Sequence, residues 1–470
     1  MPRKLAIEDR LFSLDGCHYV LALDRANCSG WDPGSILSVG RGDEDMLVTA
    51  IDGSGISSDI DKKWLEDFIR EALTEDHVFN EDFLPPSEDS GKRRVFPPGT
   101  ENITAYYRLS EPATSTAFVV QTLTDRGHQI VGLTKLSSMM AREEPMDAVD
   151  FQTAFNPRGD GYQSPAGSSH GSAAAVAAYD WLDCAIGTDT SGSGRRPALV
   201  NGVFHVLGRV FSAWLPESRV ESLWGGMEVI YPLDYLPAAV PEQTRLIDSF
   251  VGDLATCFVC SVTEMSLRDS WRECPPDGAD PDIEAYLKDV IVHTYYYSYY
   301  HLTSGWRDKH KDRFGHEPYV IPFVKQRWDS GAAVTHRQHE EGLRKLEVYR
   351  KWLFDTLFLF RRGRTLMVLP ISPVEPHYRD ERAESPRYQS ATHGLFLSPI
   401  LKAPDVVVPM GEIPYESRIS GRQEWLPVGV NLVGAPGMDK WLFDAVTRVL
   451  RSSGRPDVVS WGSRIFRNRE

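Results

Sequence analysis

Two loops rich in serine and glycine constrain the fold of this chain more than any other feature of its sequence. The first occupies residues 152–171, the second occupies residues 187–197, and the alanine-rich run 172–182 begins directly after the first loop. Because alanine has the highest helix propensity, the run is predicted to form a helix directly after the first loop. A long loop of small residues within a compact domain is more often functional than accidental, since its backbone can approach a ligand closely.

The segments around these loops alternate between helical and strand-like patterns. This alternation predicts an α/β domain. We expect helices at 116–126 and 438–450, strands at 130–133, 184–187, 366–371 and 405–409, and a largely helical stretch at 240–365.

The second loop has the composition of a nucleophile loop. A serine hydroxyl needs a base to remove its proton, and attack on a carbonyl needs donors aimed at the developing oxyanion. The backbone amides of Thr190, Ser191 and Gly192 directly precede Ser193. The first loop opens a helix, where serines are usually helix caps, so the residues alone leave both the catalytic and the capping interpretation open.

The order and spacing of several motifs resemble the amidase signature family. The string G-S-S-H-G-S-A-A-A-V-A-A spans 167–178, and G-T-D-T-S-G-S-G-R-R-P-A follows at 187–198. Phe155-Asn-Pro upstream and L-P-V-G-V-N-L-V-G at 426–434 are similar to further family segments in the same order. The resemblance extends from about residue 100 to the C-terminus.

This resemblance implies a fold, a domain division and a chemistry. The implied fold is one α/β domain at 86–470, a mixed and mainly parallel sheet with helices on both faces and a helical insert at about 240–365. Residues 1–85 would be an N-terminal extension packed on this core. The implied activity is hydrolysis of a small-molecule amide or ester through an acyl-enzyme, or acyl transfer from it, without a metal or cofactor.

The resemblance also assigns roles to individual residues. Ser193 matches the nucleophile of a Ser–Ser–Lys triad, and Ser168, after a cis peptide bond, matches its bridging serine. The oxyanion donors would be the amides of Thr190, Ser191 and Gly192. Three residues match positions that support the serines: Ser169, Asp189 and Arg195.

The base of the triad is open between several residues. Lys92 has about the family's spacing before the bridging serine, but an alternative alignment deletes the lysine segment altogether. Lys135 is nearer in sequence and matches a different family segment. His170 replaces a family glycine and is a possible alternative base, since its unperturbed pKa is about 6.5.

These departures support a second hypothesis. Ser191 also replaces a family glycine, and Gly194 replaces an isoleucine. The chain would then be a divergent amidase-like protein that has lost hydrolysis, and that binds a ligand or catalyses a different reaction in the same pocket.

Composition narrows the classes of partner. The chain has 51 basic and 66 acidic residues and a net charge of −15, which argues against nucleic acid and anionic membranes as partners. No secretory signal and no apolar run of spanning length is visible, so a cytoplasmic location is expected. The tyrosine-rich segment 295–300 and Trp224 suggest an apolar or aromatic substrate, although such a tyrosine segment is more often a helix packed with tyrosine rings.

Overall fold

The computed structural model describes residues 11–14, 17–22, 49–52, 117–128, 130–148, 152–208, 227–359, 364–382 and 387–466. The chain divides into two compact units, 1–134 and 135–470. The first unit contains a three-stranded sheet of β1 (Leu11–Leu14), β2 (Cys17–Ala22) and β3 (Thr49–Asp52), and the helix α3 (Phe118–Thr124). The predicted boundary at residue 85 lies outside the described residues and stays a prediction.

A six-stranded sheet organises the second unit. Its order is β4-β8-β9-β7-β5-β6. The strands are β4 (His205–Leu207), β5 (Glu228–Pro232), β6 (Ser261–Met265), β7 (Thr365–Leu369), β8 (Asp405–Glu416) and β9 (Gln423–Val433).

The predicted mixed α/β sheet is confirmed, but its described strands are not mainly parallel. β5 pairs in parallel with β6 and β7, whereas β7–β9, β8–β9 and β4–β8 are antiparallel. The physical reason lies in the connections: a short turn joins β8 to β9, and such a turn permits only an antiparallel pair.

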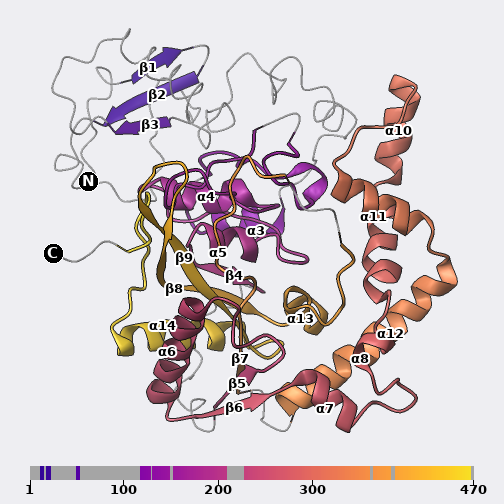
Figure 1. Cartoon of the computed structure of the whole chain (residues 1–470). Coiled ribbons are helices and arrows are strands. Elements are labelled where there is room, and N and C mark those ends of the chain that lie inside the picture. The colour runs from indigo at the N-terminus through magenta and orange to yellow at the C-terminus, as the bar shows by residue number, and fades with distance from the viewer. Residues whose placement is uncertain are drawn as a thin grey trace. The chain divides into compact units, whose positions relative to one another are not determined.

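Helices cover both faces of this sheet, as the family resemblance implies. On β7, Leu366 and Val368 face one hydrophobic cluster, while Met367 and Leu369 face another. The first cluster includes α6 (Pro241–Phe258) and α14 (Asp439–Ser453), which lie side by side (Figure 1). Because every residue of β7 is buried, its sequence is apolar throughout instead of alternating.

The second face is covered mainly by the helical insert. Figure 1 shows these helices following one another in salmon and orange. They are α7 (Leu267–Glu273), α8 (Ile283–Tyr286), the π-helix η7 (Val292–Tyr296), α9 (Tyr297–Leu302), α10 (Ser304–Phe314), α11 (Pro322–Ala332), α12 (His336–Phe354) and the π-helix η8 (Asp355–Leu359). Of these, α7, α8, η7, α12 and η8 pack on this face, whereas α9, α10 and α11 meet in a separate hydrophobic cluster. The helix α13 (Gly394–Leu401) packs on the same face.

Two predicted strands are absent. Residues 130–133 and 184–187 are irregular, and Ile130 and Leu133 are about half exposed. Short apolar runs do not form strands unless a neighbouring strand pairs with their backbone. The other predicted elements are present: α4 (His170–Ala178) in the alanine-rich run, β7, β8 and α14. Among the described helices, none is long and apolar enough to cross a membrane.

The tyrosine-rich segment contributes to packing. Tyr296 and Tyr299 are buried in hydrophobic clusters, and the Arg327 guanidinium lies 4.9 Å from the ring centroid of Tyr295. Among the described residues, the large pocket of the second unit takes its aromatic lining from Tyr235, Phe323 and Tyr388 instead.

Candidate active site

The first serine loop enters α4 through a tightly packed turn. The peptide bond between Gly167 and Ser168 is cis, and Ser168 is buried with its carbonyl oxygen accepting from the Ser137 N–H at 2.9 Å. A Cβ at Gly171 would lie 2.4 Å from the Lys135 carbonyl oxygen, so only glycine fits there. Backbone contacts therefore fix the position of Ser168 at the start of α4.

A single carboxylate organises the second loop. Asp189 accepts hydrogen bonds from the backbone N–H groups of Gly192, Gly194 and Arg195 at 2.8–2.9 Å. It also accepts from the Arg195 guanidinium, through Nε at 3.1 Å and Nη2 at 2.9 Å. Burial raises the pKa of Asp189, but the hydrogen bond and charge of Arg195 outweigh burial and lower it to about 2. The carboxylate is therefore ionised and holds the backbone on both sides of Ser193.

Arg195 connects this loop to the rest of the second unit. It is fully buried in the helix α5 (Arg195–Val200). Its Nη1 donates to Ser398 Oγ at 2.9 Å and lies 3.2 Å from Asp405, and its Nη2 donates to the Leu395 carbonyl oxygen at 2.9 Å. The guanidinium thus joins the second loop to α13 and to the start of β8.

Ser169 joins the two loops to each other. Its backbone N–H donates to the Ser193 carbonyl oxygen at 2.9 Å. Its hydroxyl donates to the Thr188 carbonyl oxygen at 3.1 Å and accepts from the Thr188 N–H at 3.0 Å. Ser169, Asp189 and Arg195 are therefore connected by hydrogen bonds to the backbone of the second loop, and their role in supporting the two serines stays a prediction.

The amides before Ser193 differ in availability. The Gly192 N–H is used by Asp189, whereas the N–H groups of Thr190 and Ser191 have no hydrogen-bond partner in the described part of the chain. Ser193 itself is half-buried, and Ser168 is almost fully buried. In this conformation, Thr190 and Ser191 are the two members of the predicted oxyanion hole with unused donors.

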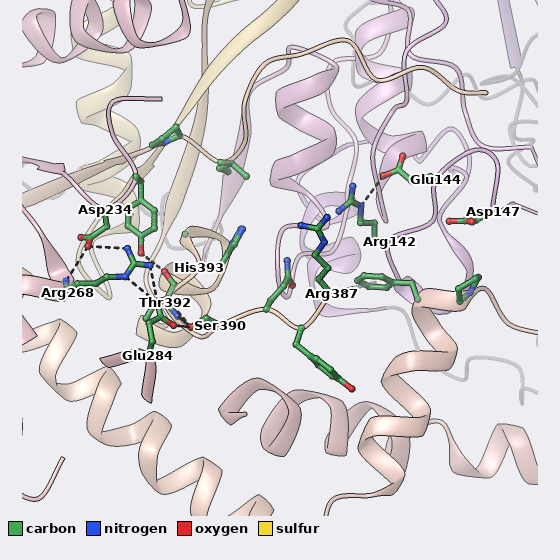
Figure 2. Close-up of a pocket in the computed structure, with 18 residues that line it drawn as sticks. Arg142, Glu144, Asp147, Asp234, Arg268, Glu284, Arg387, Ser390, Thr392 and His393 are labelled. Carbon is green, nitrogen blue, oxygen red and sulfur yellow. Dashed lines mark hydrogen bonds and ion pairs between the residues drawn. The ribbon is translucent and has the colours of Figure 1, made fainter. Parts of the chain in front are cut away.

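A pocket of about 690 Å³ adjoins this loop. Figure 2 shows an Asp234, Arg268 and Glu284 group and an Arg142–Glu144 pair on different sides of it. Gly394 is one of its lining residues, and Leu395 is the next residue in the chain. A Cβ built on Gly192 would lie 2.8 Å from the Leu395 side chain, so Leu395 lies against the second loop. The pocket is therefore linked to the loop that carries Ser193 through Leu395, although no residue of 187–197 is among its lining residues.

Comparison with known proteins fits this geometry. The family described as Amidase matches residues 103–204. A component of the glutamyl-tRNA(Gln) amidotransferase of Acidothermus cellulolyticus is 43% identical over 187 residues, which cover 37% of this chain and 36% of that protein. Amidase 1 of Arabidopsis thaliana is 41% identical over 99 residues, covering 21% and 23%. The region at residues 103–204 belongs to the amidase family. The chain matches only about a third of the length of the first of these relatives.

Solved structures of amidase-type enzymes share the fold. Allophanate hydrolase of Kluyveromyces lactis has a TM-score of 0.56 at 17% identity, over 77% of this chain and 61% of that chain. A 6-aminohexanoate cyclic dimer hydrolase has a TM-score of 0.51 at 18% identity, over 75% and 82%. At these identities the likeness shows the amidase fold alone.

The structure describes two of the three candidate bases, Lys135 and His170. Lys92 lies outside the described residues. The backbone of Lys135 lies against α4, where its carbonyl oxygen accepts from the Gly171 N–H at 3.1 Å. His170 is fully buried, and its Nδ1 accepts from the Ala154 N–H at 3.4 Å. Burial, aided by the charges of Lys135 and Arg379, lowers the pKa of His170 to about 3, so its ring is neutral at pH 7.

The buried neutral His170 predicts a pH dependence of stability. Because its pKa is lower in the folded state than in the unfolded state, the unfolded chain binds an extra proton between about pH 3 and 6.5. The free energy of unfolding should therefore fall as the pH drops through this window, by about 2 kcal/mol from His170 at pH 5. In urea unfolding at pH 7.5 and 5, His170→Gln should remove that part of the loss. His336→Gln, at an exposed histidine, is the control, and equal losses in both variants would contradict the prediction.

One charged centre near the site has no distinguishing signal in the sequence. Glu144 follows Arg142 and Glu143 and reads as part of a solvated charge run, yet it is buried. It accepts from Ser164 Oγ at 2.6 Å and from Arg142 Nε at 3.0 Å, and it lies 3.2 Å from His377 Nε2. Burial raises the pKa of Glu144, but the hydrogen bond from His377 and nearby arginines outweigh burial and hold it well below its usual range. Only the fold reveals this centre, because its partners come from distant segments.

Proposed function

We propose that this amidase-family protein cleaves an amide or ester bond of a small molecule through an acyl-enzyme on Ser193. The observation that carries the proposal is the Asp189–Arg195 network, which holds the backbone on both sides of a half-buried serine. The buried Ser168 supports it, as do the N–H groups of Thr190 and Ser191, which have no hydrogen-bond partner in the described part of the chain.

The proposed chemistry has two halves. Ser193 Oγ attacks the substrate carbonyl carbon while its proton passes through Ser168 to the base. The tetrahedral oxyanion collapses, the bond to the nitrogen or oxygen leaving group breaks, and the leaving group takes the proton. Water then attacks the acyl-enzyme and releases the acid. An amine or alcohol in place of this water gives acyl transfer, the related reaction of the same intermediate.

The names of similar proteins are consistent with this chemistry. One is a cyclic dimer hydrolase and another is a component of an amidotransferase. For the present chain, hydrolysis and acyl transfer both remain within the proposal.

Covalent labelling tests the nucleophile. We expect a fluorophosphonate probe to modify the purified protein once, and peptide mass spectrometry to place the adduct on Ser193. Labelling of another residue, or no labelling of the folded protein, would overturn the proposal.

The rate at which the probe labels Ser193 tests which residue is the base. If Lys92 supplies it, Lys92→Ala should slow modification of Ser193 by about 10²–10⁴-fold, the usual contribution of a general base. Lys135→Ala and His170→Ala should then leave the rate within a few fold of the unchanged protein. A large loss in His170→Ala with a normal rate in Lys92→Ala would instead identify a rewired base.

The alternative function is ligand binding or different chemistry without hydrolysis. It is favoured by the Gly192 N–H, which donates to Asp189 and leaves one fewer amide for an oxyanion. A misdirected donor typically costs about two to three orders of magnitude in rate. A protein that is folded but inert to the probe would support this alternative.

A further inference from the structure

His393 occupies an unusual place between the pocket and α13. It is the N-cap of that helix, and its Nδ1 accepts a hydrogen bond from the Leu395 N–H at 3.2 Å. The same side chain lines the 690 Å³ pocket, and it is exposed there (Figure 2). Nδ1 therefore caps the helix, and Nε2 is available to a ligand in the pocket.

The hydrogen bond at Nδ1 determines whether Nε2 carries a proton. A nitrogen that accepts from an N–H carries no proton, so a neutral ring has its proton on Nε2. Although the side chain is exposed to the pocket, desolvation by the surrounding protein and the charges of Arg196 and Arg195 lower the pKa of His393, so the ring is neutral at pH 7. Nε2 has no hydrogen-bond partner in the described part of the chain. His393 thus presents one unused N–H donor.

Hydrogen bonds connect the backbone around His393 to the second loop. Arg195, two residues after Ser193, donates to the carbonyl oxygen of Leu395, two residues after His393. The His393 N–H donates to the Ser390 carbonyl oxygen at 3.1 Å, and the preceding Thr392 carbonyl oxygen accepts from the Tyr235 hydroxyl. The backbone is therefore held on both sides of the ring, so that a ligand atom bonded to Nε2 has a defined position relative to Ser193.

We propose that His393 is a substrate-positioning residue whose Nε2–H donates to an oxygen in the part of the substrate that does not react. The substrate class is then an amide or ester whose acyl group carries a second acceptor oxygen, such as a ketone or amide carbonyl. The proposal rests on the proposed function in one respect: the reacting carbonyl is the one at Ser193. His393 takes no proton and forms no bond in this role.

Binding to a Ser193→Ala protein tests this without requiring turnover. The probes are two matched pairs, 4-oxopentanamide with pentanamide and 5-oxohexanamide with hexanamide, which differ only in a ketone oxygen. In protein labelled with ¹⁵N-histidine, NMR should first show the proton of His393 on Nε2. One of the two oxo-amides should then shift the Nε2 signal and bind about 2–10-fold more tightly than its partner, the value of one neutral hydrogen bond.

Two substitutions in this Ser193→Ala protein separate the helix-capping role from the ligand role. His393→Asn keeps an acceptor near the position of Nδ1, and asparagine is a preferred N-cap. His393→Gln instead places an amide N–H near the position of Nε2 and loses the cap. We expect His393→Asn to abolish the preference for the oxo-amide with little change in melting temperature. We expect His393→Gln to lower the melting temperature and keep the preference.

Several results would overturn the proposal. They are a proton on Nδ1 in the free protein, no shift of the His393 ring with any of the four amides, or an unchanged preference in His393→Asn. Because binding is measured without Ser193, loss of the acyl-enzyme proposal in the labelling experiment is a separate and distinguishable outcome.

Discussion

Replacing Ser193 with alanine should lower the hydrolysis of an activated ester such as p-nitrophenyl butyrate by roughly three to six orders of magnitude, the cost of removing a nucleophile. The reason is chemical, because alanine has no oxygen to form the acyl-enzyme. The fold should be unaffected: the Ser193 side chain makes no hydrogen bond in the described part of the chain, and Ser169 is held by the Ser193 backbone. Initial rates and melting temperature are the two measurements.

A matched control comes from the following helix. The Ser172 hydroxyl donates to the Ile186 carbonyl oxygen at 2.9 Å, so Ser172→Ala removes a buried hydroxyl without removing the proposed nucleophile. We expect its rate to stay within a few fold of the unchanged protein. Equal rates in Ser193→Ala and Ser172→Ala would refute the role of Ser193 as the nucleophile. A lowered melting temperature in Ser193→Ala would contradict the expectation that the Ser193 side chain does not stabilise the fold.

The largest effect on stability should come from Arg195→Met. This change leaves the buried carboxylates of Asp189 and Asp405 without their cation. Removing one partner of a buried ion pair usually lowers the free energy of unfolding by about 3–5 kcal/mol, because the remaining charge stays buried and uncompensated. Urea unfolding at pH 7.5 should show this loss in the free energy of unfolding.

An exposed arginine provides the comparison. Arg422 pairs with Glu424 at 2.8 Å, but its side chain is 77% exposed, so Arg422→Met should change the free energy of unfolding far less than Arg195→Met does. The loss in Arg195→Met should also shrink at pH 5, because burial already raises the pKa of Asp405 to about 6 and a protonated carboxyl needs no cation. Equal effects of the two substitutions would show that the buried network does not stabilise the fold.

Sequence reasoning worked best where neighbouring residues decide the structure. The alanine run forms α4 because its residues favour a helix individually, and α14 forms because its apolar residues recur on one face. The two serine loops were recognisable for the same reason, since glycine and serine spacing is local. Gly171 illustrates the limit of that reasoning: the sequence shows a glycine, and only the fold shows the Lys135 backbone against it.

The family resemblance, the two serine loops and the residues of the proposed nucleophile site could all be recognised in the sequence. The mainly antiparallel pairing of the described sheet, the burial of Glu144 and the place of His393 at the pocket became visible only in the folded chain. So did the direction of the Gly192 N–H, which faces Asp189. The physical reason is that helix propensity and loop composition depend on near neighbours. Strand pairing, burial and the direction of a donor instead depend on segments that meet only when the chain folds.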